Sequence, residues 1–263
     1  MNSLIFRIRK YLSYIVKAKY KRGFGVHSPF AFDTITKVYE ESSPYYIYET
    51  IEKEREKLKK DDREIDVEDF GTRRSGKRRV KDIARVSLKG KSDAQLIFRA
   101  VLAMNPKTTI ELGTSLGITT AYLAKATEKG CVHSFEGSRE IANIAEQTAK
   151  NCGTDKNTII TVGNIDDTLS EYLGKTEGID VAFIDANHTE EATKRYFKQI
   201  EAKLSKENGL IIIDDIHGNA GMDRAWNYIK SETQGDVTFD IYSMGLIYYK
   251  KGLSRMDYVY SRI

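Results

Sequence analysis

Residues 108–124 read Thr108-Thr-Ile-Glu-Leu-Gly-Thr-Ser-Leu-Gly-Ile-Thr-Thr-Ala-Tyr-Leu-Ala124, and this stretch decides the fold. It predicts a short buried strand, then a turn containing Gly113 and Gly117, and then a helix. The first N–H groups of a helix have no partner inside the helix, so a strand that leads directly to a helix N-terminus can bind a ligand there. The two glycines keep the turn bare, which lets a flat ligand lie against the backbone.

An acidic residue, Glu111, precedes this turn. A carboxylate there would repel a pyrophosphate, but it suits a ligand that carries ammonium and sulfonium charges and sugar hydroxyls. The Gly-x-x-x-Gly spacing of Gly113 and Gly117 also differs from the Gly-x-Gly-x-x-Gly pattern of dinucleotide sites. Both features favour S-adenosylmethionine over NAD as the cofactor.

From about residue 93, apolar strand-like runs alternate with helical patterns. The predicted strands cover residues 108–113, 131–136, 157–162, 179–185 and 209–214. Repeated strand–helix–strand units predict a parallel sheet with helices on both faces. Two further runs, 237–243 and 245–251, predict a closing antiparallel hairpin. The expected fold class is therefore α/β and Rossmann-like, with a seven-stranded, mostly parallel sheet and an N-terminal helical extension.

Acidic residues stand at the ends of four of the five predicted parallel strands, where open α/β sheets form their ligand sites. These residues are Glu111, Glu136, Asp185 and the pair Asp214 and Asp215. Capping of the following helix would explain one or two such acids, but it explains all of them poorly. The carboxylate of Glu136 can accept hydrogen bonds from both hydroxyls of a ribose.

Three segments carry a resemblance to a known family. They are Glu111-Leu-Gly-Thr-Ser-Leu-Gly117, Phe183-Ile-Asp-Ala-Asn-His188 and Ile211-Ile-Ile-Asp-Asp-Ile-His217. Over roughly residues 93–250 the chain resembles the class I S-adenosylmethionine-dependent O-methyltransferases, in particular the caffeoyl-CoA and catechol O-methyltransferases and bacterial relatives of undefined substrate. The resemblance implies an enzyme that methylates a hydroxyl group of a small acceptor, for which an aromatic compound is one option.

The resemblance also implies a set of cofactor-binding residues. They are Glu111, Gly113, Thr114, Ser115, Gly117, Glu136, Asn164, Ile165 and Asp185. Within this set, Thr114 and Ser115 would hydrogen-bond the methionine carboxylate, and Asn164 and Ile165 would line the adenine.

A divalent metal is a further implication of the resemblance. In the metal-dependent relatives two Asp ligands match Asp185 and Asp214, but their third ligand is an Asn where this chain has Asp215. Three carboxylates suit Mg²⁺ or another hard divalent cation, so a metal site formed by these residues is an option. The alternative is that the two acids at 214 and 215 cap the next helix.

The expected catalytic residues are His188, Asp185 and His217. The metal-dependent relatives carry a Lys three residues after the first metal ligand, and His188 stands at that place in this chain. A histidine titrates near neutrality and can accept the proton of a hydroxyl. His217 is a second candidate base. Methyl transfer is an in-line displacement, so positioning and deprotonation of the acceptor supply most of the catalysis.

The first third of the chain differs in charge from the rest. Residues 1–100 contain 24 Lys and Arg against 15 Asp and Glu. The basic segment from Arg73 to Arg79 makes RNA methylation the main alternative function, and a non-catalytic binding module is the second. Base-amine methylation is disfavoured because no proline follows Asp185. Aromatic residues that could line an acceptor pocket are Tyr45, Tyr46, Tyr48, Trp226 and Tyr242.

The expected domains are a helical extension with a basic loop at residues 1–92, a cofactor-binding domain at 93–252 and a tail at 253–263. Residues 3–20 follow an amphipathic pattern, and we expect this helix to dock on its own domain, with a membrane surface as the alternative.

The two cysteines, Cys131 and Cys152, imply neither a disulfide framework nor a zinc site. No apolar run reaches the length of a membrane span, so a cytoplasmic location is expected. The expected partner is a small-molecule acceptor, and a homodimer is left open.

Overall fold

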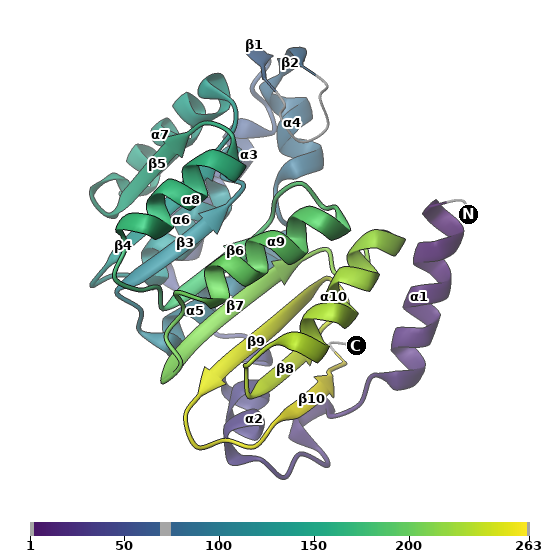
Figure 1. The fold of residues 1–263 in the computed structure, drawn as a ribbon. Helices are drawn as coiled ribbons and strands as arrows, with labels where there is room; N and C mark the ends of the chain where they lie inside the picture. Colours follow the sequence, from purple (N-terminus) through teal and green to yellow (C-terminus); the bar gives the residue numbers. More distant parts are fainter. Residues whose placement is uncertain (1–2, 69–74, 262–263) are drawn as a thin grey trace. The chain divides into compact units, whose positions relative to one another are not determined.

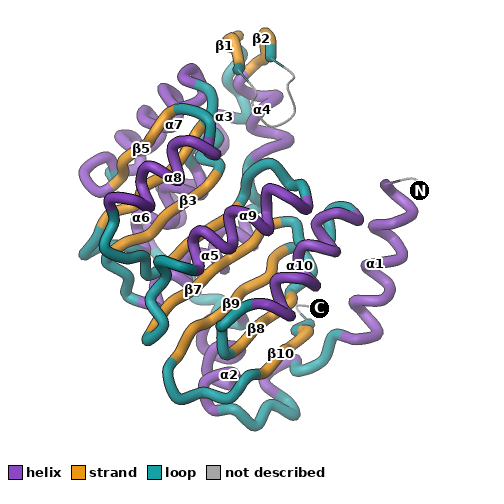
Figure 2. Tube along the Cα trace, viewed as in Figure 1, coloured by secondary structure: helices purple, strands orange, loops and turns teal. Residues whose placement is uncertain are grey.

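The computed structural model describes residues 3–68 and 75–261 (Figures 1 and 2). Arg73 and Arg74 of the predicted basic segment lie outside the described residues. The chain forms two compact units. We call the described part of residues 1–41 and 178–263 the split unit, and residues 42–177 the continuous unit, again as far as they are described. These units differ from the expected domain boundaries, which remain predictions.

The continuous unit holds three parallel strands in the order β3-β4-β5. Its strands are β1 (Glu64–Val67), β2 (Gly76–Arg79), β3 (Thr108–Leu112), β4 (Cys131–Glu136) and β5 (Thr158–Val162). Its helices are α3 (Tyr46–Leu58), α4 (Val80–Ser87), α5 (Lys91–Met104), α6 (Ile118–Ala126), α7 (Arg139–Cys152) and α8 (Ile165–Lys175), with a short 3₁₀ turn at Asp155–Asn157. Strands β1 and β2 pair as an antiparallel hairpin where the sequence predicted only a loop.

The buried positions of the continuous unit explain its helices and strands. In β3, Ile110 and Leu112 on one face and Thr109 and Glu111 on the other are all fully buried, as expected for a strand with both faces covered. Nearly every residue of α6 is buried, so this helix lies within the core. In contrast, α7 buries one face and ends at Gly153, whose left-handed backbone is a common helix terminator.

The split unit holds five strands in the order β10-β8-β9-β7-β6. They are β6 (Val181–Ile184), β7 (Asn208–Asp214), β8 (Val237–Asp240), β9 (Met244–Lys250) and β10 (Met256–Val259). Its helices are α1 (Ser3–Lys17), α2 (Pro29–Thr34), a π-helical turn (Ile35–Tyr39), α9 (Glu190–Glu201) and α10 (Ala220–Glu232), with a 3₁₀ turn at Lys21–Gly23. In Figure 1, α9 and α10 lie side by side over one face of these strands. Rings of Phe30 and Tyr39 contact Tyr248 and Phe239 on the other face.

The expected hairpin is present, because β8 and β9 pair antiparallel and β9 also pairs antiparallel with β7. The expected tail at 253–263, however, contributes β10, which pairs parallel with β8. Tyr258 and Tyr260 are buried there, and their burial explains why this segment joins the sheet. The sheet therefore has eight strands rather than the seven expected, and it remains mostly parallel.

None of the described helices combines the length and the apolar content that a bilayer crossing requires. Helix α1 contacts the rest of the split unit along one side, where Tyr14 is buried and donates a hydrogen bond to the carbonyl oxygen of Tyr260. Helix α1 thus docks on its own domain, but not through the predicted apolar face, on which Ile8, Leu12 and Ile15 are exposed.

Candidate functional site

The turn at residues 113–117 follows β3 in the continuous unit. The N–H groups of Gly113 and Thr114 donate to the carbonyl oxygen of Phe135, at 3.0 and 3.2 Å, so the turn is tied to β4. Gly113 and Gly117 have φ angles of 96° and 82°, in the region that favours glycine. A Cβ at position 117 would lie 3.0 Å from the Cα of Ala145, so this position has no room for a side chain. The glycines predicted from the sequence are therefore required by the turn itself.

Glu136 ends β4 and points its carboxylate at this turn. Its Oε2 accepts a hydrogen bond from the Ser115 N–H at 2.9 Å, and its Oε1 accepts one from the Ser138 N–H at 3.0 Å. Ser115 itself has a φ of 49°, a conformation that non-glycine residues adopt mainly where surrounding contacts require it. The two N–H groups fix the orientation of a half-buried carboxylate beside a glycine turn. Such a group can accept further hydrogen bonds from a ligand.

Glu111 lies within β3 rather than on the turn, and its side chain is fully buried. Its Oε2 accepts hydrogen bonds from the hydroxyls of Thr120, at 2.5 Å, and Ser134, at 2.6 Å. The hydroxyl of Thr114 lies 2.5 Å from that of Ser134. Glu111 thus links β3, β4 and α6 beneath the turn. Thr120 and Ser134 are supporting residues that the sequence analysis missed, although each is a polar residue in an apolar run.

The remaining predicted cofactor residues of this unit have defined local roles. The hydroxyl of Ser115 lies 2.8 Å from that of Ser87 at the end of α4. Asn164 caps α8, since its Oδ1 accepts a hydrogen bond from the Asp166 N–H at 3.1 Å. Ile165 is the first residue of that helix and is half-buried. Their predicted contacts with the cofactor remain predictions.

Asp185 and His188 form a pair in the split unit, in the loop between β6 and α9. The Nε2 of His188 lies 3.2 Å from the Oδ1 of Asp185. Asn187 and His188 have φ angles of 60° and 36°, which are uncommon for residues with a side chain. The Asn219 amide donates to the carbonyl oxygen of His188 at 3.1 Å and helps to hold the loop. Strained backbone at a candidate acid–base pair is typical of functional sites.

The pKa of His188 is raised above its usual value. Burial of the ring opposes protonation, but the hydrogen bond and the charge of Asp185 outweigh it, with further contributions from the charges of Asp215 and Asp214. Because Asp185 faces Nε2, the hydrogen-bonded proton belongs on that nitrogen, and Nδ1 is left to accept a proton from elsewhere.

The three carboxylates predicted as metal ligands do not form a ready metal site. Asp214 is buried, whereas Asp215 is exposed and has a φ of 49°. Asp185 is paired with His188. Across residues 3–68 and 75–261 there is no group of three or more His, Cys, Asp or Glu side chains that could hold a metal ion. A hard divalent cation requires converging oxygen ligands, so this donor set does not fit one as it stands.

His217 is buried between two carboxylates. Its Nδ1 lies 2.8 Å from the Oδ1 of Asp223, and its Nε2 lies 2.8 Å from the Oδ2 of Asp240. Lys10 of α1 pairs with Asp223 at 2.7 Å, and the Trp226 indole N–H donates to Asp240 at 3.2 Å. We call Lys10, His217, Asp223 and Asp240 the His217 cluster. Both ring nitrogens of His217 are engaged within it, so we propose that His217 acts in structure rather than as the base.

Burial opposes protonation of His217, but its hydrogen bonds to Asp223 and Asp240 outweigh this effect and raise its pKa. Burial also opposes ionisation of both carboxyls, yet their hydrogen bonds with His217 keep the pKa of each below its usual value. All three shifts therefore favour the charged forms of His217, Asp223 and Asp240. The sequence analysis singled out His217 but missed Asp223 and Asp240 as its partners.

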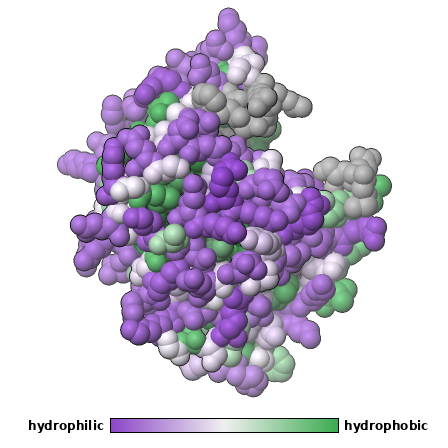
Figure 3. Space-filling model, in the orientation of Figure 1, coloured by the Kyte–Doolittle hydropathy of each residue, from purple (hydrophilic) through white to green (hydrophobic). Residues whose placement is uncertain are grey.

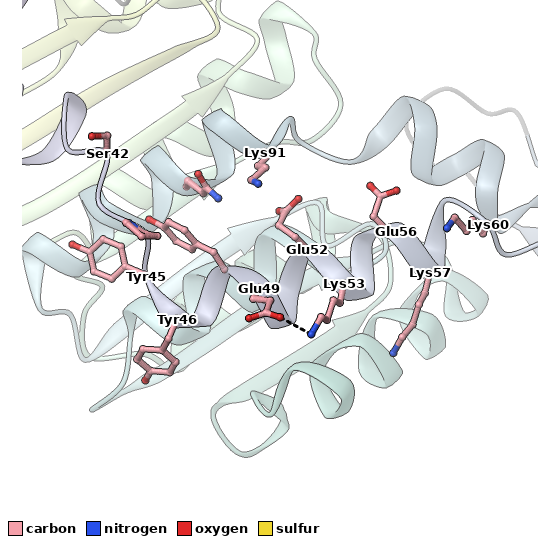
Figure 4. Close-up of a pocket in the computed structure, with 13 residues that line it drawn as sticks. Ser42, Tyr45, Tyr46, Glu49, Glu52, Lys53, Glu56, Lys57, Lys60 and Lys91 are labelled. Atoms are coloured by element: carbon pink, nitrogen blue, oxygen red, sulfur yellow. Dashed lines mark ion pairs between the residues drawn. The ribbon is translucent and has the colours of Figure 1, made fainter.

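An open groove of about 1080 Å³ lies along α3 in the continuous unit (Figure 4). Tyr45, Tyr46 and Tyr48 line it, as the sequence analysis allowed for an acceptor pocket. Charged side chains also line the groove, and two of them, Glu49 and Lys53, form an ion pair at 2.6 Å along α3. Of the two other aromatic candidates, Trp226 is fully buried in the split unit, and Tyr242 is half-buried there with its ring 5.7 Å from that of His217.

Comparisons with known proteins agree with the fold. Residues 110–216 match a family model described as a methyltransferase domain. An O-methyltransferase from Bacillus cereus, solved with SAH, is 17% identical with a TM-score of 0.61, over 82% of this chain and 96% of that one. A methyltransferase from Podospora anserina, also SAH-bound, is 16% identical with a TM-score of 0.55, over 80% and 99%.

A third structure, an O-methyltransferase from Streptomyces achromogenes involved in tomaymycin synthesis and solved with SAM, is 17% identical with a TM-score of 0.53. The alignment covers 62% of this chain and 82% of that one. No curated protein sequence matches the chain. At these identities the solved structures establish the fold, and they confirm the expected α/β, Rossmann-like class.

Proposed function

We propose that this chain, which carries a methyltransferase domain, transfers the methyl group of S-adenosylmethionine to a hydroxyl oxygen of a small acceptor. The observation that carries this proposal is the glycine turn at 113–117 with Glu136 held beside it by the Ser115 and Ser138 N–H groups. The family match over residues 110–216 supports methyl transfer. So do the SAM- and SAH-bound structures that share the fold.

The continuous unit supplies the residues that would hold the cofactor. The half-buried carboxylate of Glu136 suits the ribose hydroxyls, and the bare turn at Gly113 and Gly117 suits a close approach of the methionine part. The bound cofactor would supply an electrophilic methyl group on a sulfonium. Glu111, with its hydrogen bonds to Thr120 and Ser134, keeps the turn in place.

The split unit supplies the group that takes the proton. Asp185 holds the Nε2 side of His188, which leaves Nδ1 to accept the hydroxyl proton of the acceptor. An acceptor oxygen that loses its proton becomes a better nucleophile, and this is the main chemical demand of methyl transfer to oxygen. We derive no step through a metal, because the carboxylates do not converge on one.

Replacing His188 with alanine is expected to lower kcat by about a hundredfold to ten-thousandfold, since a general base contributes on that scale. S-adenosylmethionine affinity should stay unchanged. The His27→Ala variant, which removes an exposed histidine from the same unit, is the matched control for radiometric methyl-transfer rates. An H188A enzyme with wild-type kcat would remove His188 from the mechanism.

The pH profile tests the Asp185–His188 pair separately. The base must be unprotonated, so kcat/KM should rise as pH increases through the raised pKa of His188. The Asp185→Asn variant removes the charge that raises this pKa, so its profile should rise at lower pH. If D185N has the same pH profile as the wild type, a group other than His188 controls the pH dependence of the reaction.

The reaction itself is tested by calorimetry with S-adenosylmethionine, followed by methyl transfer to a panel of catechols, phenols and RNA with and without EDTA. We expect cofactor binding, activity on a small hydroxylated acceptor and no loss in EDTA. Activity restricted to RNA would favour RNA methylation, the main alternative function. Loss of activity in EDTA would support a role for a divalent metal. Absence of cofactor binding by folded protein would contradict the proposal at its first step and favour a binding module.

Homodimer formation and a cytoplasmic location remain predictions.

A further inference from the structure

Helix α1 presents an apolar stripe to its surroundings. Ile5, Ile8, Leu12, Ile15 and Val16 are each between 45 and 81% exposed. Their spacing of three, four, three and one residues places them on one face of an α-helix. An exposed row of five aliphatic side chains is costly in water, so this face is expected to have an occupant.

The opposite face of α1 is the one that holds the helix in place. Tyr14 is buried against Tyr260, and Lys10 pairs with Asp223. The ring of Tyr11 lies 5.0 Å from that of Tyr242. Residues 10 and 14 point away from the apolar stripe on a helix with 3.6 residues per turn, and Tyr11 lies at its flank. Because these contacts hold the helix on its own domain, the apolar stripe remains available to bind a partner.

The apolar surface continues beyond the helix. Phe24, just after the 3₁₀ turn, is 87% exposed, and Phe32 is also exposed. Of the twelve exposed large hydrophobic side chains in the described part of the chain, eight belong to residues 5–32, so the surface is concentrated there. Figure 3 shows apolar side chains between hydrophilic ones along the edge where Figure 1 places α1.

The charge of residues 1–32 indicates whether a second copy of the chain or an anionic bilayer covers this surface. Residues 1–32 contain seven basic side chains and no acidic one. They are Arg7, Arg9, Lys10, Lys17, Lys19, Lys21 and Arg22. A second copy of the chain, paired through the same face, would bring two strongly positive segments together. An anionic bilayer would instead neutralise them, and each basic residue near its surface adds to the binding.

We propose that the surface formed by residues 5–32 binds anionic lipid bilayers peripherally. The apolar stripe of α1 enters the boundary between headgroups and acyl chains. The basic residues other than Lys10, which is paired with Asp223, contact lipid phosphates. A basic amphipathic helix beside exposed aromatic residues is the arrangement that lies in a membrane interface. This inference does not depend on the chemistry of the methyltransferase.

Flotation of the full chain with vesicles provides the test. The protein should float with vesicles of phosphatidylcholine and phosphatidylglycerol, less with phosphatidylcholine alone, and less again as salt is added. Leu12→Glu should lower the partition coefficient about tenfold or more, because it puts a charge in place of a leucine that enters the bilayer. The matched control is Ile159→Glu, which changes an equally accessible isoleucine of the continuous unit and should bind like the wild type.

Charge reversal tests the electrostatic part. Arg9→Glu with Lys17→Glu should weaken binding to anionic vesicles by about tenfold or more and leave the weak binding to neutral vesicles unchanged. Melting temperature and S-adenosylmethionine affinity should stay at wild-type values in all these variants. A result against membrane binding can therefore be told apart from a result against the proposed methyl transfer. Folded protein that does not float would overturn the inference. A dimer in sedimentation that L12E dissociates would assign the surface to a second copy instead.

Discussion

Glu136→Ala is expected to weaken S-adenosylmethionine binding by about a hundredfold. The carboxylate is oriented by the Ser115 and Ser138 N–H groups and would accept hydrogen bonds from two ribose hydroxyls. Hydrogen bonds to a charged group contribute about 1.5–3 kcal/mol, and removal of the carboxylate also frees the turn that it holds. Titration calorimetry below the melting temperature of each variant gives the affinity directly.

The matched control is Glu140→Ala, which removes an exposed carboxylate four residues further along the same unit. It should bind the cofactor like the wild type. Glu136→Gln should fall between the two, because an amide can still accept from one hydroxyl but cannot accept from both N–H groups. If folded E136A binds with wild-type affinity, Glu136 has no role in the ribose site.

His217→Ala is expected to lower the free energy of unfolding by about 3–5 kcal/mol, because it leaves the buried carboxylates of Asp223 and Asp240 without the imidazole between them. The charges of Lys10 and Lys230 offset part of this loss. Chemical denaturation at neutral pH measures the loss. Adding Asp240→Asn to H217A should recover part of it, since one unpaired buried charge is then removed. His133→Ala is the control, because His133 contacts the Tyr172 ring rather than carboxylates and should cost about 1 kcal/mol.

The contribution of the His217 cluster to the free energy of unfolding should decrease at both high and low pH. The folded-state pKa of His217 is raised, so its contribution is present at low pH and is lost as pH rises through that raised value. The pKa values of Asp223 and Asp240 are lowered, so their contribution is present at neutral pH and is lost as pH falls through those lowered values. The stability difference between wild type and H217A should therefore be largest at pH values between the lowered pKa values of Asp223 and Asp240 and the raised pKa of His217. A difference that stays constant with pH would show that the cluster is not charged.

The sequence predicted the alternating elements of the fold well, because hydrophobic period and turn residues are local properties. The strand, glycine turn and helix at 108–124 appear as β3, the turn at 113–117 and α6. Glu136 and Asp185 were also recognised from sequence as candidates, since both stand at strand ends, and His188 through its distance from Asp185. The contact between Asp185 and His188 was not predicted. The role of Glu111 was harder to predict, because its partners Thr120 and Ser134 become apparent only when β4 and α6 pack around it.

By itself, then, the sequence determined the α/β class, the succession of strands and helices along the chain, and the glycine turn. Only the tertiary structure placed β10 in the sheet and His217 between two carboxylates, with Lys10 brought from the other end of the chain. It also left the apolar stripe of α1 exposed, where periodicity alone could not tell a docked face from a free one. The physical reason is the same in each case. Burial and charge pairing depend on residues that are distant in the chain, whereas helix and strand patterns are set by near neighbours.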